Sequence, residues 1–325
     1  MLAIRGFLYC IANIATGGVN LNILITGGTG FIGAALIPTL LSDGHKVIAV
    51  TRGTRPYQQG VTYIPAPTGN ELFSPAIIAK ADAIINLAGE NISGHRWSDA
   101  VKTALLTSRL EITEKLVQSI ARNKDQSKSY PRILINASAV GYYGVSKEAV
   151  FTETSPNGTG FLADVCRQWE KQALAAQAAD VRVVLLRLGM ILGPGGALKR
   201  MVMPFIFGLG GIIGDGRQWL SWVHRHDVAA VIGYALGHPL SGPYNVVSPH
   251  PLRMGEFMAT LSAVLRKSCW TKMPAWAAKL VFGEMADELL LNGQQVLPQR
   301  LEEAGFAFSF SELETALTDI YRHKA

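Results

Sequence analysis

A short apolar run near the start of the chain leads directly into a glycine-rich turn and then into an apolar helical segment. The run ends at Thr26, and glycines recur after it as Gly27, Gly30 and Gly33. This spacing allows a tight turn, a close approach of backbone amides to a pyrophosphate, and close packing of helix on strand. The amino terminus of the helix adds a site for an anion. An ordinary strand–helix turn also uses glycine, but a position between a strand and a helix favours dinucleotide binding.

Residues at the ends of three predicted strands are expected to contact the cofactor. The glycine turn supplies Thr26, Gly27, Gly28, Thr29, Gly30, Phe31, Ile32 and Gly33. Arg52 ends the second strand, where an acidic residue would bind the 2′-hydroxyl of NAD and an arginine fits the 2′-phosphate of NADP. We therefore expect NADP(H) in preference to NAD(H), the alternative being that Arg52 is a solvated loop charge. The third of these strands ends in Leu87, Ala88 and Gly89, which would lie along the cofactor ribose.

Apolar runs and amphipathic helical stretches alternate through the first 190 or so residues. The runs are Leu21–Thr26, Lys46–Thr51, Ala83–Leu87, Arg132–Ala137 and Val181–Leu188, and the clearest helical stretches are Lys102–Ala121 and Asp164–Ala179. Such alternation predicts an α/β fold in which helices cover both faces of a doubly wound parallel sheet, as in Rossmann-like domains.

The sequence pattern changes after the segment Gly193-Pro194-Gly195-Gly196, where glycine and proline begin to interrupt the apolar segments. We therefore expect a second, smaller module to begin there. The predicted division is a dispensable extension at 1–20, an NAD(P)-binding domain at 21–195 with 224–247 packing back onto it, and a substrate module made of 196–223 and 248–325.

Composition excludes several classes of protein. With 49% hydrophobic and 17% charged residues the chain is too apolar for a disordered protein. The 30 basic and 24 acidic residues are scattered rather than gathered into a stripe, which argues against nucleic acid and is compatible with small anionic ligands. No apolar stretch reaches about 18 residues, so no membrane-spanning helix is expected.

The cysteines indicate a chain without disulfides or a cysteine metal site. Cys10, Cys166 and Cys269 are odd in number and far apart. A cytoplasmic, metal-free protein is the expectation. The alternative is a weak signal peptide in the apolar run from Gly6 to Ala12, which is short and is broken by Asn13.

Many further blocks resemble the extended short-chain dehydrogenase/reductase superfamily, and more narrowly its atypical epimerase family branch. They include Ile84–Ile92, Ser108-Arg109, Ser138–Gly144, Phe161–Ala163, Trp169-Glu170, Arg187–Gly189, Trp222–His224 with Asp227, Pro298, Arg300-Leu301 and Gly305-Phe306. The resemblance implies an NAD(P)-dependent epimerase or oxidoreductase acting on a nucleotide sugar or another carbonyl or hydroxyl compound. Some relatives also carry a cell-division label, and homodimers are common among them.

The catalytic pair of the superfamily has no counterpart at the expected place in this chain. Active members use Tyr-x-x-x-Lys for proton transfer, but here the tyrosine position resembles Phe161, whose fourth neighbour is Val165. Tyr143 and Lys147 have the Tyr-x-x-x-Lys spacing, but they lie in a glycine-containing loop and not on a helix turn that would align them, so we interpret their spacing as a coincidence. The resemblance assigns the hydroxyl that positions substrate to Ser138. Tyr142 or Tyr143 would then act as a substitute acid; the alternative, weighed equally, is that both rings pack at the strand end.

Four further residues are candidates for substrate contact. Glu90 and Asn91 follow the strand that ends at Leu87, at the edge where doubly wound sheets bind ligands, and Glu90 would accept a proton or bond to the loop backbone. Trp222 would line an apolar slot or belong to the core. His224 and Asp227 have the spacing of an acid/base pair, but we favour Asp227 as a helix N-cap.

Taken together, these residues favour an NADP(H)-dependent oxidoreductase or epimerase-like enzyme of unknown substrate. The competing hypothesis is a non-catalytic NADP(H)-binding sensor or regulatory protein, which the replacement of the Tyr and Lys by Phe161 and Val165 supports. A link to cell division rests on the family label alone.

Overall fold

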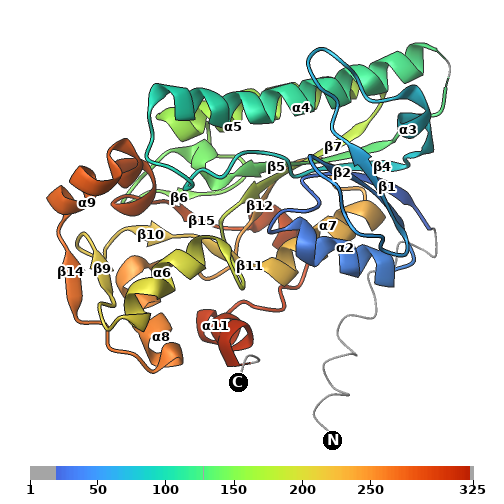
Figure 1. Cartoon of the computed structure of the whole chain (residues 1–325). Helices are drawn as coiled ribbons and strands as arrows, with labels where there is room; N and C mark the ends of the chain where they lie inside the picture. Colours follow the sequence, from blue (N-terminus) through green and yellow to red (C-terminus); the bar gives the residue numbers. More distant parts are fainter. Residues whose placement is uncertain (1–19, 127, 323–325) are drawn as a thin grey trace, which may run out of the picture.

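The computed structural model describes residues 20–126 and 128–322 (Figure 1). The extension predicted for residues 1–20 lies outside these ranges apart from Asn20, and Cys10 lies outside them too.

A parallel sheet of seven strands forms the centre of the fold, in the order β12-β7-β5-β4-β1-β2-β3. The strands are β1 (Asn22–Thr26), β2 (Lys46–Thr51), β3 (Val61–Pro65), β4 (Ala83–Asn86), β5 (Ile133–Ala139), β7 (Arg182–Leu188) and β12 (Gly242–Val246). From β1 the chain first builds outward to β2 and β3, and then returns to add β4 on the other side of β1. The expected doubly wound Rossmann-like sheet is confirmed, and its switch point lies between β1 and β4, the place where such sheets bind ligands.

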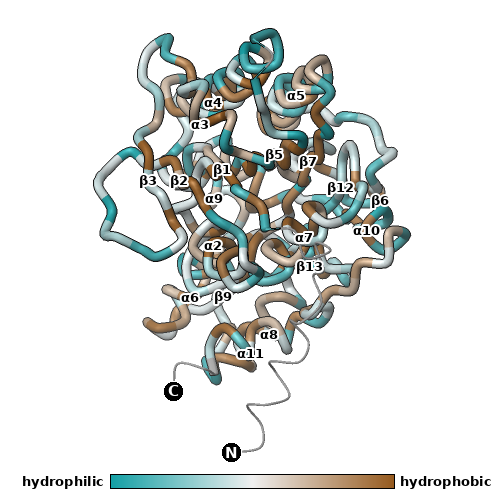
Figure 2. The backbone as a smooth tube through the Cα atoms, turned by 90° about the vertical axis from the view of Figure 1, so that its right-hand side faces the viewer, coloured by the Kyte–Doolittle hydropathy of each residue, from teal (hydrophilic) through white to brown (hydrophobic). Residues whose placement is uncertain are grey.

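Helices cover both faces of the sheet (Figure 1). One face carries α2 (Gly33–Ser42) and α7 (Arg225–Gly237), which pack on alternate strand residues such as Ile23 and Ile25. The other face carries α3 (Pro75–Lys80), α4 (Asp99–Asp125), α5 (Phe161–Leu174) and the 3-10 segment η2 (Ala175–Ala179). Leu24 packs on that second face, so β1 buries every other residue on each side. Figure 2 shows the result, with hydrophobic strands at the centre and hydrophilic loops around them.

The structure departs from the predicted elements in two edge strands and in the bounds of two helices, since α4 spans Asp99–Asp125 where Lys102–Ala121 was predicted. Strands β3 and β12 were not predicted, and both contain a proline: Pro65 ends β3 at the edge of the sheet, and Pro243 lies in β12 at the other edge. Proline is tolerated at sheet edges, where one side of the strand needs no donor. Helix α5 begins three residues before Asp164, because Gly160 adopts a φ of +109° and turns the chain into the helix.

The remaining elements lie around one end of the sheet. They are η1 (Val140–Tyr143), β6 (Val150–Phe151), β8 (Met190–Leu192), α6 (Gly196–Ile206), β9 (Gly211–Ile213), β10 (Trp219–Leu220), β11 (Trp222–His224), β13 (Leu252–Arg253), α8 (Met254–Leu265), β14 (Thr271–Met273), α9 (Ala275–Phe282), the π-helical turn η3 (Ala286–Leu290), β15 (Gln295–Val296), α10 (Gln299–Glu303) and α11 (Leu313–Arg322). A separate apolar core joins α6, α8 and α11. Segment 224–247 contributes α7 and β12 to the main sheet. Within residues 20–126 and 128–322, no helix has both the length and the apolar character needed to cross a membrane.

Candidate functional site

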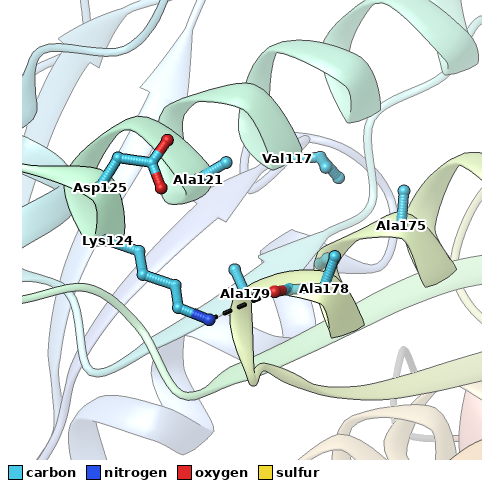
Figure 3. Close-up of a pocket in the computed structure, with 8 residues that line it drawn as sticks. Val117, Ala121, Lys124, Asp125, Ala175, Ala178 and Ala179 are labelled. Carbon is cyan, nitrogen blue, oxygen red and sulfur yellow. Dashed lines mark hydrogen bonds between the residues drawn. The ribbon is translucent and has the colours of Figure 1, made fainter.

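Two surface pockets lie away from the glycine turn. One, of about 250 Å³, lies between the end of α4 and η2 and is lined mostly by alanines, with Lys124 bonded across it to the Ala178 carbonyl (Figure 3). The other, of about 630 Å³, lies beside the first residues of β1 and β2. Both are at the amino edge of the sheet, whereas parallel sheets bind ligands at the carboxyl edge. The candidate site is therefore built from the residues at the carboxyl edge.

The glycine turn has the geometry that the sequence predicts for a dinucleotide cradle. Gly27 has a φ of +70°, and a Cβ added there would lie 2.6 Å from the Leu87 carbonyl oxygen. A Cβ at Gly33 would lie 2.2 Å from the Gly28 carbonyl oxygen, so only glycine allows the first turn of α2 to approach β1 this closely. Thr29 and Gly30 are exposed at the tip of the turn. The residues present thus leave an open backbone surface at a helix amino terminus, which fits a pyrophosphate.

Buried polar side chains fix the strand ends beneath the turn. The Thr26 hydroxyl donates to the Asn86 side chain, whose amide donates to Asn136 at 2.6 Å and to Thr113 at 2.8 Å. Thr26, Asn86 and Asn136 are at most 1% exposed, so Thr26 supports the site from below through its side chain. The ends of β1, β4 and β5 are therefore held together by satisfied buried hydrogen bonds.

Arg52 and Glu90 meet at the end of β2. Arg52 is exposed, and its guanidinium lies 3.0 Å from the Glu90 carboxylate. The Glu90 backbone is fixed as well, because its amide donates to Ser108 and its carbonyl accepts from Arg109. Glu90 is therefore paired with Arg52 in this structure, and its expected role as a proton acceptor beside the nicotinamide stays a prediction. Asn91 accepts hydrogen bonds from Ser93 and caps its own loop.

Ser138 belongs to a buried ion-pair network. Its hydroxyl donates to the Glu170 carboxylate at 2.7 Å, and Arg187 binds that carboxylate through Nε at 2.9 Å and Nη2 at 2.8 Å. All three side chains are at most 5% exposed. Burial alone would lower the pKa of Arg187, but the hydrogen bonds and charge of Glu170 outweigh it and raise that pKa. Ser138 is thus committed to Glu170 in this structure.

Tyr143 and Tyr142 differ sharply in their surroundings. Tyr143 is 2% exposed, donates to Asn245 at 2.6 Å and accepts from Arg187 at 2.8 Å. Burial raises the pKa of Tyr143 to about 12, far from the range that suits proton transfer near neutral pH. Tyr142 is only half-buried, its ring stacks 3.5 Å from the Arg187 guanidinium carbon, and its hydroxyl has no hydrogen-bond partner in the described ranges.

The first turn of α5 is capped by a residue from the C-terminal module. The amides of Phe161 and Leu162 donate to the Glu288 carboxylate at 2.8 and 3.1 Å. The Phe161 ring packs edge-on against Trp97 and lies 5.1 Å below the Lys102 ammonium. Sequence reasoning missed Glu288, because nothing in its local sequence indicates a partner more than a hundred residues away.

Trp222 and His224 are buried, which corrects their assignment to substrate contact. Trp222 is fully buried in the core that α6, α8 and α11 share, and its indole donates to the His250 carbonyl. His224 is 2% exposed and accepts from the His226 amide, so it is the N-cap of α7. Burial, together with the neighbouring His226 and Arg225, lowers the pKa of His224 to about 3.

Asp227 is not the N-cap that we expected. Its carboxylate accepts from the amides of Ser309 and Phe310 at 2.9 and 3.0 Å and thereby ties α7 to the C-terminal segment. His224, His226 and Asp319 also lie at this joint, each with one ligand-type atom within 4.8 Å of the others. The Nε2 of His224 is 3.5 Å from Asp319, and Phe310 stacks on its ring. These contacts give the cluster a structural role in joining α7 to α11.

The sequence matches two family models. The model described as NAD dependent epimerase/dehydratase family matches residues 23–247, which span the whole sheet. The chain belongs to this family. A domain of unknown function (DUF1731) matches residues 273–320 in the C-terminal module of this family member.

Individual relatives agree with this assignment. The Arabidopsis thaliana epimerase family protein SDR39U1 homolog, chloroplastic, is 39% identical over 92% of this chain and 86% of its own. Epimerase family protein YfhF of Bacillus subtilis (strain 168) is 39% identical over 92% of this chain and 98% of its own.

Solved structures are similar as well. The crystal structure of human epimerase family protein SDR39U1 (isoform2) with NADPH has a TM-score of 0.81 and 33% identity, covering 93% of this chain and 99% of the human one. A nucleoside-diphosphate sugar epimerase from Corynebacterium glutamicum has a TM-score of 0.73 and 28% identity, covering 96% of this chain and 61% of that one. The predicted resemblance to the epimerase branch is confirmed, and this family member is an NAD(P)-binding protein of the short-chain dehydrogenase/reductase type.

Proposed function

We propose that the protein binds NADP(H) across the carboxyl edge of its sheet and uses it as an oxidoreductase or epimerase-like enzyme on a small organic substrate. The observation that carries this proposal is Arg52, which extends from the end of β2 into solvent, at the position where NAD-binding domains have an acidic residue. A guanidinium there binds a 2′-phosphate through charge-assisted hydrogen bonds. The NADPH in the human relative supports the same cofactor.

The glycine turn would hold the pyrophosphate, and the ends of β4 and β5 would carry the cofactor toward the Tyr142 side of the site. When bound, NADPH supplies the hydride. The chain must supply the proton, and Tyr142 is the candidate, because its hydroxyl has no hydrogen-bond partner among the described residues and its half-buried ring lies beside Arg187. Ser138 and Tyr143 are positioning residues in this scheme, since their hydroxyls hold Glu170 and Asn245.

The substrate would lie between the sheet edge and the C-terminal module. Trp97 and Phe161 form an apolar wall there, and Phe282 at the end of α9 and Met285 just after it pack against this wall. Lys102, bound to Glu284 at 2.6 Å, supplies a cation at the rim. An apolar wall with one cation suits an organic compound that carries an anionic group. The sugar-nucleotide epimerase among the similar structures supports a nucleotide sugar as such a compound.

A second function is favoured by one specific observation. The hydroxyls of Ser138 and Tyr143 are both hydrogen-bonded to buried side chains of the protein, and the resemblance assigns Phe161 to the position of the superfamily tyrosine. A site of this kind binds NADP(H) without turning it over, as a sensor of cofactor state would.

Anaerobic single-turnover experiments separate the two functions. Protein loaded with NADPH is mixed with a panel of carbonyl compounds and keto nucleotide sugars, and loss of absorbance at about 340 nm is followed. For the enzyme we expect oxidation by at least one compound, and a slower rate in Tyr142→Phe with NADPH affinity unchanged. Tyr130→Phe is the matched control, because Tyr130 lies on the far side of the sheet. If no compound oxidises NADPH, the sensor replaces the enzyme as the proposed function.

A further inference from the structure

Arg225 lies against Phe31 of the glycine turn. It is the first residue of α7, and its guanidinium carbon lies 5.3 Å from the centre of the Phe31 ring. Gly193 fits between them, since a Cβ added there would lie 3.0 Å from Phe31 and 3.3 Å from Arg225. Both α2 and α7 pack on the same face of the sheet, so their amino termini share its carboxyl edge.

The surroundings of Arg225 are unfavourable for a cation. Its Nε is buried and has no hydrogen-bond partner, and no carboxylate within residues 20–126 and 128–322 pairs with it. Burial lowers its pKa. The amino terminus of α7 also carries the positive end of the helix dipole, which repels a guanidinium. An anion bound beside Arg225 would offset these costs, because it would accept hydrogen bonds from the terminal nitrogens of the guanidinium and balance the charge of the side chain and of the helix terminus.

We propose that Arg225 binds the pyrophosphate of the dinucleotide together with the amino terminus of α2. The inference rests on the proposed NADP(H) binding and adds a residue to that site. Phe31 belongs to the turn that would hold the pyrophosphate, and the Arg225 guanidinium lies over its ring. The 2′-phosphate belongs to Arg52 at the end of β2. A pyrophosphate also occurs in nucleotide sugars, so the test includes one.

The test compares two dinucleotides and two arginines. NADPH, NADH and the nucleotide sugar UDP-glucose are titrated separately into the full-length wild type, Arg225→Gln, Arg225→Lys and Arg52→Gln by calorimetry. Both dinucleotides carry the pyrophosphate, so Arg225→Gln is expected to weaken both by the same factor, about ten-fold or more. Arg225→Lys should lose less affinity for both dinucleotides, because lysine keeps the positive charge although it lacks the paired N–H donors of the guanidinium. Arg52→Gln should weaken NADPH alone. Lys272→Gln removes one exposed charge in β14 and is the control for net charge, with no change expected.

Two further measurements distinguish a role of Arg225 in binding from a role in stability alone. The unfolding midpoint of the ligand-free protein should stay the same or rise in Arg225→Gln, since the buried Nε of Arg225 has no hydrogen-bond partner among the described residues. The salt dependence of NADH binding should be shallower in Arg225→Gln, because one cation fewer meets the phosphates.

Different outcomes overturn different claims. If the wild type binds neither dinucleotide, the proposed function and this inference both fail. If the wild type binds both and Arg225→Gln binds them equally well, only the inference fails. The inference also fails if Arg225→Gln weakens the binding of NADPH but not of NADH, or weakens the binding of UDP-glucose but of neither dinucleotide. It fails too if the loss of dinucleotide binding in Arg225→Gln is accompanied by a lower unfolding midpoint, since a loss of folded structure would then explain it.

Discussion

The Arg52 guanidinium and the Glu90 carboxylate form an ion pair of 3.0 Å across the carboxyl edge of the sheet, although the two residues are 38 positions apart. In the proposed complex the 2′-phosphate of NADPH takes the place of Glu90 on Arg52. Glu90 is therefore a competitor of the cofactor, and its strength is that of an exposed ion pair, about 0–1 kcal/mol.

Replacing Glu90 should consequently improve NADPH binding. We expect Glu90→Gln to tighten NADPH up to about five-fold at low ionic strength and to leave NADH unchanged. Calorimetric titration measures both, and the gain should shrink as salt is added. Glu148→Gln, an exposed change elsewhere, is the control. A gain of the same size for NADH would show that Glu90 acts on the site in general and not on the phosphate.

Removal of the hydroxyl should change the stability of the protein at one of the two adjacent tyrosines and not at the other. Tyr143→Phe removes the buried partner of the Asn245 side-chain oxygen and one of the partners of Arg187, so we expect the free energy of unfolding to fall by about 1–3 kcal/mol. Tyr142→Phe removes a hydroxyl without a partner in the described part of the chain and should leave stability unchanged. Urea unfolding of both variants checks this. Equal destabilisation would mean that the Tyr142 hydroxyl is also structural.

The buried pair of Glu170 and Arg187 should be the most sensitive point of the site. Glu170→Gln keeps the shape but leaves the Arg187 charge uncompensated, and breaking a buried pair in this way costs about 3–5 kcal/mol. Ser138→Ala removes one hydrogen bond to the same carboxylate and should cost about 1–3 kcal/mol. Chemical denaturation of both variants gives the ranking. A smaller loss in Glu170→Gln than in Ser138→Ala would contradict the network described above.

His224 should make stability depend on pH. Its pKa is lowered from 6.5 to about 3 in the folded protein, so the unfolded chain takes up the proton first as the pH falls. The stability that neutral His224 contributes is complete above about pH 6.5 and is lost toward pH 3, at up to about 1.4 kcal/mol per pH unit. His224→Gln should flatten the curve between pH 5 and 6.5, where few carboxylates titrate, and His95→Gln should not. An unchanged slope in His224→Gln would refute the shift.

The sequence predicts best what depends on neighbouring residues. The glycine turn, the strands that precede it and follow it, and the position of Arg52 all follow from local pattern, and the sheet has them in place. Alternation of strands and helices was sufficient to predict parallel pairing. The edge strands β3 and β12 were not predicted, because their proline residues and short length weaken the apolar pattern of a strand.

The partners of the candidate residues could not be read from the sequence. Ser138 and Tyr143 have suitable hydroxyls, but Glu170 and Asn245 bind those hydroxyls from 32 and 102 positions away. Asp227 has the residue type of an N-cap, yet it binds amides 82 and 83 positions further on. Such contacts arise only when distant segments pack together, and they decide whether a polar side chain faces a ligand or supports the fold.

The titration of NADPH and NADH into wild-type protein and Arg52→Gln tests the central claim most directly. We predict that the wild type binds NADPH more tightly than NADH, and that Arg52→Gln loses about ten-fold or more for NADPH while NADH is unaffected. Equal affinity of the wild type for the two dinucleotides, or an equal loss of both in Arg52→Gln, would contradict the assignment of Arg52 to the 2′-phosphate and with it the proposed NADP(H) preference.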